Sequence, residues 1–329
     1  MKEKIETNAV SITRIAKENK VGKQKLSRAY KEVLSDYRLY RKIFEEDFEN
    51  ESFVFSENFG ENMAIDETGL FNGQLYTIIY NKDKKGKKGS LAAIIKGTKA
   101  SVISAAVNSK VPVDKRMNIK EITLDLSNSM DWASREIALN AIKTYDRFHV
   151  EKLIIEAVQQ VRIEYRWKAI EKENQLKKNK DIWRLPRYHN GDSEKQLLVR
   201  SRYLLYKRRK DWTTEQRQRA EILFSVFPKI RRAYEYYMEF KNIYRMNRLS
   251  AEHYLLNWIK RVKKSGIDVL VTVAKTIERH LGGILNYLEN RATNASIENF
   301  NRKLKSFLEK LRGVNDKDLF FYRLIKLYA

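Results

Sequence analysis

The 329-residue sequence contains no cysteine, which excludes disulfide bridges and zinc sites built on thiolates. Its four histidines are scattered, without the spacing of a metal-binding motif. Only 3 prolines and 12 glycines occur, and so few helix breakers in a chain rich in Lys, Glu, Leu and Ile predict a largely helical protein. No apolar run approaches the roughly 20 residues that span a bilayer, and no signal-peptide core is present, so a membrane partner is not expected.

The balance of charge is the strongest signal in the composition. Lys and Arg total 66 against 42 Asp and Glu, which gives a formal net charge of +24. Such a charge favours nucleic acid as a partner, because each phosphate that a protein neutralises releases counterions. Residues 151–290, which are expected to be almost wholly helical, hold 31 Lys and Arg against 17 Asp and Glu and so carry +14 of this charge.

Residues 61–150 show a different pattern, in which short apolar runs alternate with turn residues. Runs at 62–66, 74–81 and 90–96 predict an antiparallel meander of three strands, joined by residues 68–73 and by a basic turn. A helix, a fourth strand at 118–125, a second helix and a fifth strand at 141–145 follow. This order is typical of an α/β protein with a ribonuclease H-like fold, a mixed sheet with flanking helices.

Three acidic residues fall on elements that this fold would bring together. Asp66 ends the predicted first strand and Asp125 the fourth, and these strands are neighbours in such a sheet. Glu298 lies on an amphipathic helix predicted at 293–311. An isolated Asp at such a position is most often a helix cap, and an isolated Glu there a first-turn acid. Together the three are hard oxygen ligands, which suit two Mg(II) or Mn(II) ions in phosphoryl transfer.

Residues 11–37 predict a helix-turn-helix with its turn at residues 20–22. Ala16, Val21 and Leu26 occupy the positions where such a unit buries a small residue, a turn aliphatic and an anchor of the second helix. An ordinary helical hairpin is the alternative. The residues that would face DNA are Lys23, Lys25 and Arg28.

A second basic cluster lies in the helical region, where four cations precede a tryptophan. Aromatic side chains beside cations can stack on unpaired bases, although a Trp in a helical region is more often part of the core. Two further cations, on the helix of Glu298, complete the candidate DNA contacts. These residues are Lys207, Arg208, Arg209, Lys210 and Trp212, with Arg302 and Lys303.

Four strings occur along the chain in a fixed order: AIDE at 64–67, TLDLS at 123–127, DRFHV at 146–150 and IENFN at 297–301. With these strings the chain resembles bacterial insertion-sequence transposases of the DDE class, specifically the ISL-three-like group, for which DRFHV is the most distinctive. The resemblance implies that Asp66, Asp125 and Glu298 are the catalytic and metal-binding triad. It also implies that Asp146 and His149 support the site.

The activity implied by the resemblance is metal-dependent strand cleavage and 3′-hydroxyl strand transfer at the ends of an insertion sequence. The implied partner is double-stranded DNA, both the terminal inverted repeats of the element and the target, bound by a dimer. The implied location is the cytoplasm, at the nucleoid. A non-catalytic DNA-binding protein, either an inactive relative or a regulator of transposition, is the alternative. An RNA-binding helical protein would explain the charge but not the three acids.

The implied domain order has five parts: a helix-turn-helix segment at 1–40, a linker at 41–60, the first part of the catalytic core at 61–150, a basic helical insertion at 151–290 and the C-terminal helices of the core at 291–329. Members of the group usually begin with a cysteine-rich zinc module, which is not found in this sequence. Three explanations are open: the module is encoded separately, it is dispensable, or it has been lost.

Overall fold

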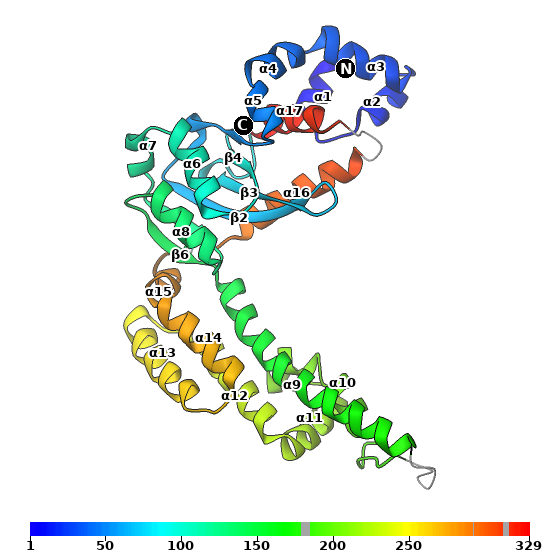
Figure 1. Cartoon of the computed structure of the whole chain (residues 1–329), viewed down its shortest axis with the longest axis vertical. Helices are drawn as coiled ribbons and strands as arrows, with labels where there is room; N and C mark the ends of the chain where they lie inside the picture. Colours follow the sequence, from blue (N-terminus) through cyan, green and yellow to red (C-terminus); the bar gives the residue numbers. More distant parts are fainter. Residues whose placement is uncertain (179–184, 292, 312–315) are drawn as a thin grey trace. The chain divides into compact units, whose positions relative to one another are not determined.

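The computed structural model describes residues 1–178, 185–291, 293–311 and 316–329 (Figure 1). The chain divides into two compact units, one formed by Met1–Asp146 with Ala292–Ala329 and the other by Arg147–Arg291. None of the helices in the described ranges is long and apolar enough to cross a membrane.

The first unit is built on one mixed sheet with the strand order β1-β4-β3-β2-β5-β6. Its strands are β1 (Phe53–Val54), β2 (Asn62–Leu70), β3 (Gln74–Asn81), β4 (Leu91–Lys96), β5 (Glu121–Leu124) and β6 (Ile142–Tyr145). The first four pair antiparallel, whereas β5 lies parallel to both β2 and β6. The predicted mixed α/β class is therefore confirmed, and the strand order is consistent with a ribonuclease H-like sheet.

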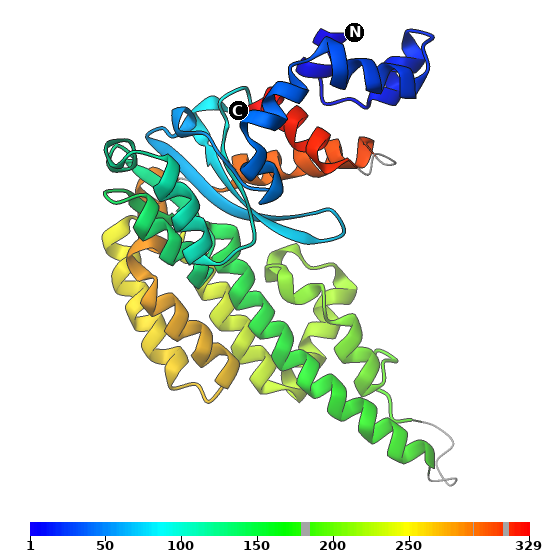
Figure 2. The ribbon, with the colours of Figure 1, turned by 45° about the horizontal axis from the view of Figure 1, so that its top comes forward.

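The hairpin of β2 and β3 is longer than the sequence suggested (Figure 2). Pairing continues to Leu70 opposite Gln74, so Asp66 lies in the middle of β2, and its prediction as a strand end is wrong. The chain reverses only at residues 71–73, which all have positive φ. Asn72 and Gly73 favour this conformation, and they place the turn three residues later than the polar residues of β2 suggested.

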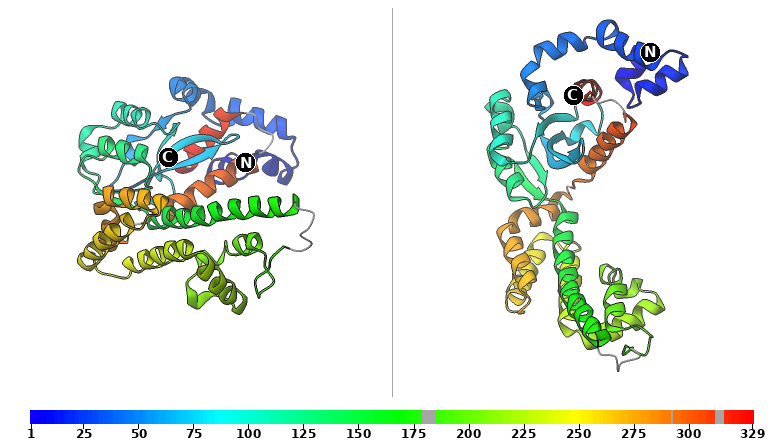
Figure 3. Two further views of the ribbon diagram at one scale, coloured as in Figure 1. Left: turned by 60° about the horizontal axis from the view of Figure 1, so that its bottom comes forward. Right: turned by 45° about the vertical axis from the view of Figure 1, so that its right-hand side comes forward.

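Helices cover both faces of this sheet (Figure 3). On one side lie α6 (Ala100–Lys110) and α8 (Asn128–Ile137), with the short α7 (Val113–Met117) between them in sequence. On the other side α16 (Ala295–Lys310) packs against β2. Side chains at every third or fourth position of α16 are buried there, and they are Ile297, Phe300, Leu304 and Phe307. This apolar stripe fixes which side of α16 faces the sheet.

The N-terminal segment is helical: α1 (Lys2–Thr7), α2 (Ile12–Glu18), α3 (Lys23–Ala29), a π-helical turn at Tyr30–Leu34, α4 (Tyr37–Ile43) and α5 (Glu45–Glu49). Ser11 caps α2 through its hydroxyl, and Ala16 and Leu26 are buried as the helix-turn-helix pattern predicts. Val21 is 36% exposed, so the predicted burial of a turn aliphatic is wrong. The turn is instead held by the backbone bond from Val21 N–H to Ala16 O.

Residues 41–60 are part of the first unit, and their interpretation as a linker is wrong. Phe48, Phe53 and Phe55 are buried in its core, and β1 pairs with β4 at the edge of the sheet. The ring of Phe53 lies 5.3 Å from that of Phe321 in α17 (Lys317–Tyr328). The acidic residues of this stretch resembled a solvated connection, but its aromatic residues anchor it to the core.

The second unit is helical in its described part, apart from turns and 3-10 segments. Its helices are α9 (Arg147–Lys178), α10 (Glu194–Arg200), α11 (Thr214–Val226), α12 (Pro228–Ile243), α13 (Arg248–Lys263), α14 (Asp268–Arg279) and α15 (Leu281–Asn290). Between α10 and α11 the chain forms only short 3-10 turns, at Leu204–Tyr206 and Arg209–Asp211. The basic run at 207–210 therefore lies on a turn rather than on a helix.

Candidate active site

Strand register places three acidic residues at one level of the sheet in the first unit. The last pair between β2 and β5 is Ala64 with Thr123, and the last pair between β5 and β6 is Leu124 with Tyr145. Continuing the same register brings Asp66, Asp125 and Asp146 level on three adjacent strands. Asp66 and Asp146 are buried and Asp125 is half-buried.

Two hydrogen bonds attach α16 to this row of acids. The backbone N–H of Asn294, the N-cap of the helix, donates to Oδ1 of Asp146 (3.0 Å). About two turns further on, Nδ2 of Asn301 donates to Oδ2 of Asp66 (2.8 Å). Glu298 lies between them, four residues after Asn294 and three before Asn301, so all three share one face of the helix.

Glu298 is consequently directed to the acidic row. One of its carboxylate oxygens lies within 4.8 Å of a carboxylate oxygen of Asp146. Asp66 and Glu298, 232 positions apart in the numbering, are connected through Asn301, which lies one turn from Glu298 and bonds to Asp66. The predicted triad and Asp146 therefore lie in one region of the sheet, but of these four acids only Asp146 and Glu298 belong to a described group whose ligand atoms all lie within 4.8 Å of one another.

Asp125 is oriented by the start of α8. Its Oδ1 accepts the backbone N–H of Ser127 (2.9 Å), and Ser127 itself is the N-cap, with its hydroxyl accepting from Met130 N–H. The alternative interpretation of Asp125 as the helix cap is therefore wrong. A single backbone bond fixes one carboxylate oxygen, and the side chain is half-buried just after the C-terminal end of β5.

A buried network holds β6 in place beneath Asp146. Asp131 on α8 accepts from the hydroxyl of Tyr145 and from Nζ of Lys143 (3.2 Å). Burial raises the pKa of Asp131, but the hydrogen bond from Tyr145 and the charges of Lys143 and Arg135 outweigh burial and lower this pKa overall. Burial and the bond to Asp131 raise the pKa of the Tyr145 hydroxyl. The end of β6, and with it Asp146, is therefore tied to α8.

The oxygen atoms around this row of acids suit a hard divalent cation. Asp125 and Glu298 form no ion pair with any residue in the described part of the chain. Asn294 and Asn301 are buried, and each keeps an amide oxygen without a hydrogen-bond partner in that same part. Carboxylate and amide oxygens are the ligands that Mg(II) and Mn(II) prefer.

Sequence reasoning overlooked the two asparagines that attach α16. Asn301 falls on the polar side of the predicted helix, three residues after Glu298, and this spacing could have indicated it. The contact of Asn294 uses its backbone, which no side-chain pattern marks. His149 belongs to the second unit, where it lies half-buried in the first turn of α9.

The cations proposed to contact DNA lie at the surface of their units. Arg208 is half-buried, and all the others are exposed. The exposed cations are Lys23, Lys25 and Arg28 on α3, Lys207, Arg209 and Lys210 before α11, and Arg302 and Lys303 on α16.

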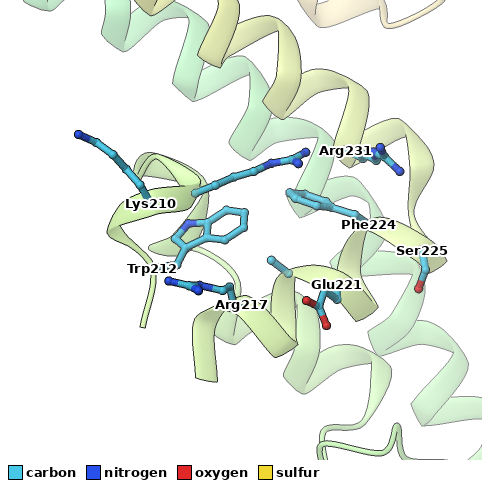
Figure 4. A pocket seen from close by; sticks show the side chains of 9 residues that line it. Lys210, Trp212, Arg217, Glu221, Phe224, Ser225 and Arg231 are labelled. Carbon is cyan, nitrogen blue, oxygen red and sulfur yellow. The ribbon is translucent and has the colours of Figure 1, made fainter. Parts of the chain in front are cut away.

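Trp212 is different, and its prediction as a base-stacking residue is wrong. Only 7% of it is exposed, its Nε1–H donates to Leu204 O (2.8 Å), and its ring packs 5.6 Å from that of Tyr234. With Arg209 and Arg217 it lines a pocket of about 600 Å³. Figure 4 shows Trp212 beside Arg217 in this pocket. Burial and a satisfied indole N–H make it a core residue of the second unit.

Comparison with known proteins identifies the family of the chain. A family model described as a transposase, of the DDE ISL3 type, matches residues 63–324. Because the match covers most of the sequence, the chain belongs to this transposase family, the ISL3-like group of DDE transposases. No curated protein and no solved structure matches the chain. The family match confirms the resemblance shown by the four sequence strings and indicates a DNA-modifying enzyme.

Proposed function

We propose that the protein is a DNA transposase that cleaves DNA at the ends of an insertion sequence and transfers the freed 3′-hydroxyl to target DNA. Asp66 and Asp125 of its ribonuclease H-like sheet and Glu298 of α16 would be the catalytic residues. The observation that supports this most strongly is the attachment of α16 to Asp66 and Asp146, which directs Glu298 toward the row of acids that includes Asp66 and Asp125.

Asp66, Asp125 and Glu298 would hold two Mg(II) or Mn(II) ions through their carboxylate oxygens. The bound ions would activate the attacking oxygen and stabilise the leaving one. Two further residues would hold these groups in place. Asn301 orients the carboxylate of Asp66, and Asp146 fixes the N-terminus of α16. His149 is proposed only as a supporting residue.

The proposed substrate is double-stranded DNA that carries the terminal inverted repeats, and the target duplex. The exposed cations of α3, of the 207–210 turn and of α16 would contact its phosphates. Synapsis of two ends would make the working form a dimer on DNA. A separately encoded N-terminal module would be a further partner if end recognition needs the zinc module of other members.

The test is a cleavage assay on DNA that carries the sequences flanking this gene, with Mg(II) or Mn(II), comparing wild type with Asp125→Asn. We expect metal-dependent nicking that is lost in the variant, while DNA affinity stays similar or rises because one negative charge is removed. Equal nicking by both proteins would remove Asp125 from the site. Tight binding without nicking in either metal would favour the alternative, a non-catalytic DNA-binding relative.

A further inference from the structure

Lysines crowd the turn that joins β3 to β4. Residues 82–89 hold five lysines and a single acid, Asp83. Lys84, Lys85, Lys87 and Lys88 are exposed, and the exposed Lys303 reaches the same turn from α16. These five residues, Lys84, Lys85, Lys87, Lys88 and Lys303, are called the lysine ridge below.

The backbone of the turn is shaped to present these side chains. A Cβ on Gly86 would lie 3.0 Å from Nζ of Lys303, so the absence of a side chain lets that ammonium approach the turn. Lys85 has φ 51°, a left-handed conformation that Gly or Asn adopts at lower cost. The turn therefore carries a lysine at a position where local conformation disfavours one.

No acid of the described chain neutralises the ridge. None of its five lysines forms an ion pair or a side-chain hydrogen bond in the described residues. Neighbouring charges are paired instead: Lys82 binds Glu121 (2.7 Å), and the carboxylate of Asp83 accepts from Asn62 (2.9 Å). Five unpaired charges of one sign repel one another, and an anionic partner would remove that repulsion.

The ridge lies at the end of the sheet where β2 begins, whereas Asp125 and Asp146 follow the ends of β5 and β6, which run parallel to β2. Asn81, the last residue of β3, pairs with Met63, and Asp66 pairs with Ile78, so the turn begins at Lys82, four residues from the level of Asp66. At about 3.3 Å per residue this is about 13 Å. Along α16, Lys303 follows Glu298 by five residues, or about 7.5 Å of helix axis.

We propose that the lysine ridge binds backbone phosphates of the DNA strand whose cleavage Asp66, Asp125 and Glu298 would catalyse, within about four nucleotides of the cleaved phosphate. Successive phosphates of one strand are about 3.4 Å apart along the helix axis and farther apart in space, so about 13 Å corresponds to at most about four nucleotides. The position of these phosphates relative to cleavage rests on the proposed function, whereas the binding of DNA by the ridge does not. The contact would carry no sequence information, because phosphates are alike at every step.

The first test measures the salt dependence of affinity for duplex DNA in wild type, in a variant with all five lysines changed to Gln, and in one with all five changed to Arg. Each phosphate contact contributes about 0.9 to the slope of log K against log salt. If the ridge makes at least two contacts, the Gln variant loses about 2 from the slope and about 60-fold in affinity at 0.1 M salt. The Arg variant, which keeps the charge, retains both. An unchanged slope in a Gln variant that melts like wild type would overturn the proposal.

The second test locates the contact. A series of end-carrying duplexes, each with one phosphate replaced by an uncharged methylphosphonate, is bound to wild type and to the Gln variant. Neutral phosphates at the contacted positions, within about four nucleotides of the nick, should weaken wild type about eightfold each and leave the Gln variant unaffected. Equal losses in both proteins at every position would refute the ridge contact even if wild type cleaves. Loss of nicking with an intact ridge effect would instead refute the proposed chemistry.

Discussion

Asn301 offers the sharpest test of how α16 is attached to the acidic residues of the sheet. Its amide donates to the buried carboxylate of Asp66, and its own oxygen has no partner in the described chain. Asn301→Ala removes a hydrogen bond to a charged group, which contributes about 1.5–3 kcal/mol. For a unit of this size each kcal/mol corresponds to about 2–4 °C, so the melting temperature should fall by about 3–12 °C.

Asn301→Asp separates the structural from the metal-binding role of this position. It places a second carboxylate against Asp66, and two carboxylates this close repel one another unless a proton or a cation lies between them. In EDTA the Asp variant should therefore melt below the Ala variant. With Mn(II) it should regain more stability than wild type gains, since each tenfold increase in cation affinity adds about 1.4 kcal/mol at saturating metal.

The assay is thermal melting of the full chain in EDTA and in millimolar Mn(II), without DNA, so that it does not depend on catalysis. Asn299→Asp is the matched control, because Asn299 is exposed on the same helix. It should show neither the loss in EDTA nor the additional gain with Mn(II). The reasoning fails if Asn301→Asp melts at or above Asn301→Ala in EDTA and gains no more from Mn(II) than wild type.

Two further predictions concern the second unit. Trp212→Ala should cost about 3–5 kcal/mol of stability, whereas Trp212→Phe should cost less and leave DNA affinity unchanged below the melting temperature; a large loss of affinity with unchanged melting would contradict the buried position of the ring. Asp192 is fully buried against Arg219 (2.9 Å) and Arg200, and although burial raises its pKa, these two cations outweigh burial and lower it. A lowered folded-state pKa gives stability that is present above the unfolded pKa of about 3.9 and lost as pH falls through the folded value. Hydrogen exchange in α10 should therefore be constant from pH 7 to about 4, after correction for the intrinsic rate, and accelerate below; Asp192→Asn should be less protected at neutral pH and should not show this acid step.

Local pattern predicted the elements of the fold well, because the spacing of apolar side chains reflects which face of a helix or strand is buried. The strands at 74–81 and 141–145 and the helix of Glu298 follow their patterns closely. The pattern failed where two signals competed. In β2 the polar residues after Asp66 resembled a turn, yet the cross-strand partners of β3 keep this segment extended.

For the candidate site, the sequence indicated which acids could act, through their spacing and the four family strings. It did not show what brings them together. The bond of Asn301 to Asp66 and that of Asn294 to Asp146 join residues 235 and 148 positions apart, and no local signal encodes such a contact. Their geometry depends on how the apolar face of α16 packs against the sheet.

The sequence by itself determined the charge of the protein, its mixed α/β class and its transposase family, because these depend on composition, periodicity and short strings. Tertiary structure alone decided that Trp212 is a core residue, that residues 41–60 belong to the sheet unit and that five lysines share one ridge. The physical reason is the same in each case. Burial and charge pairing depend on neighbours distant in the chain, and a residue beside cations in sequence can still have its side chain surrounded by aromatic rings.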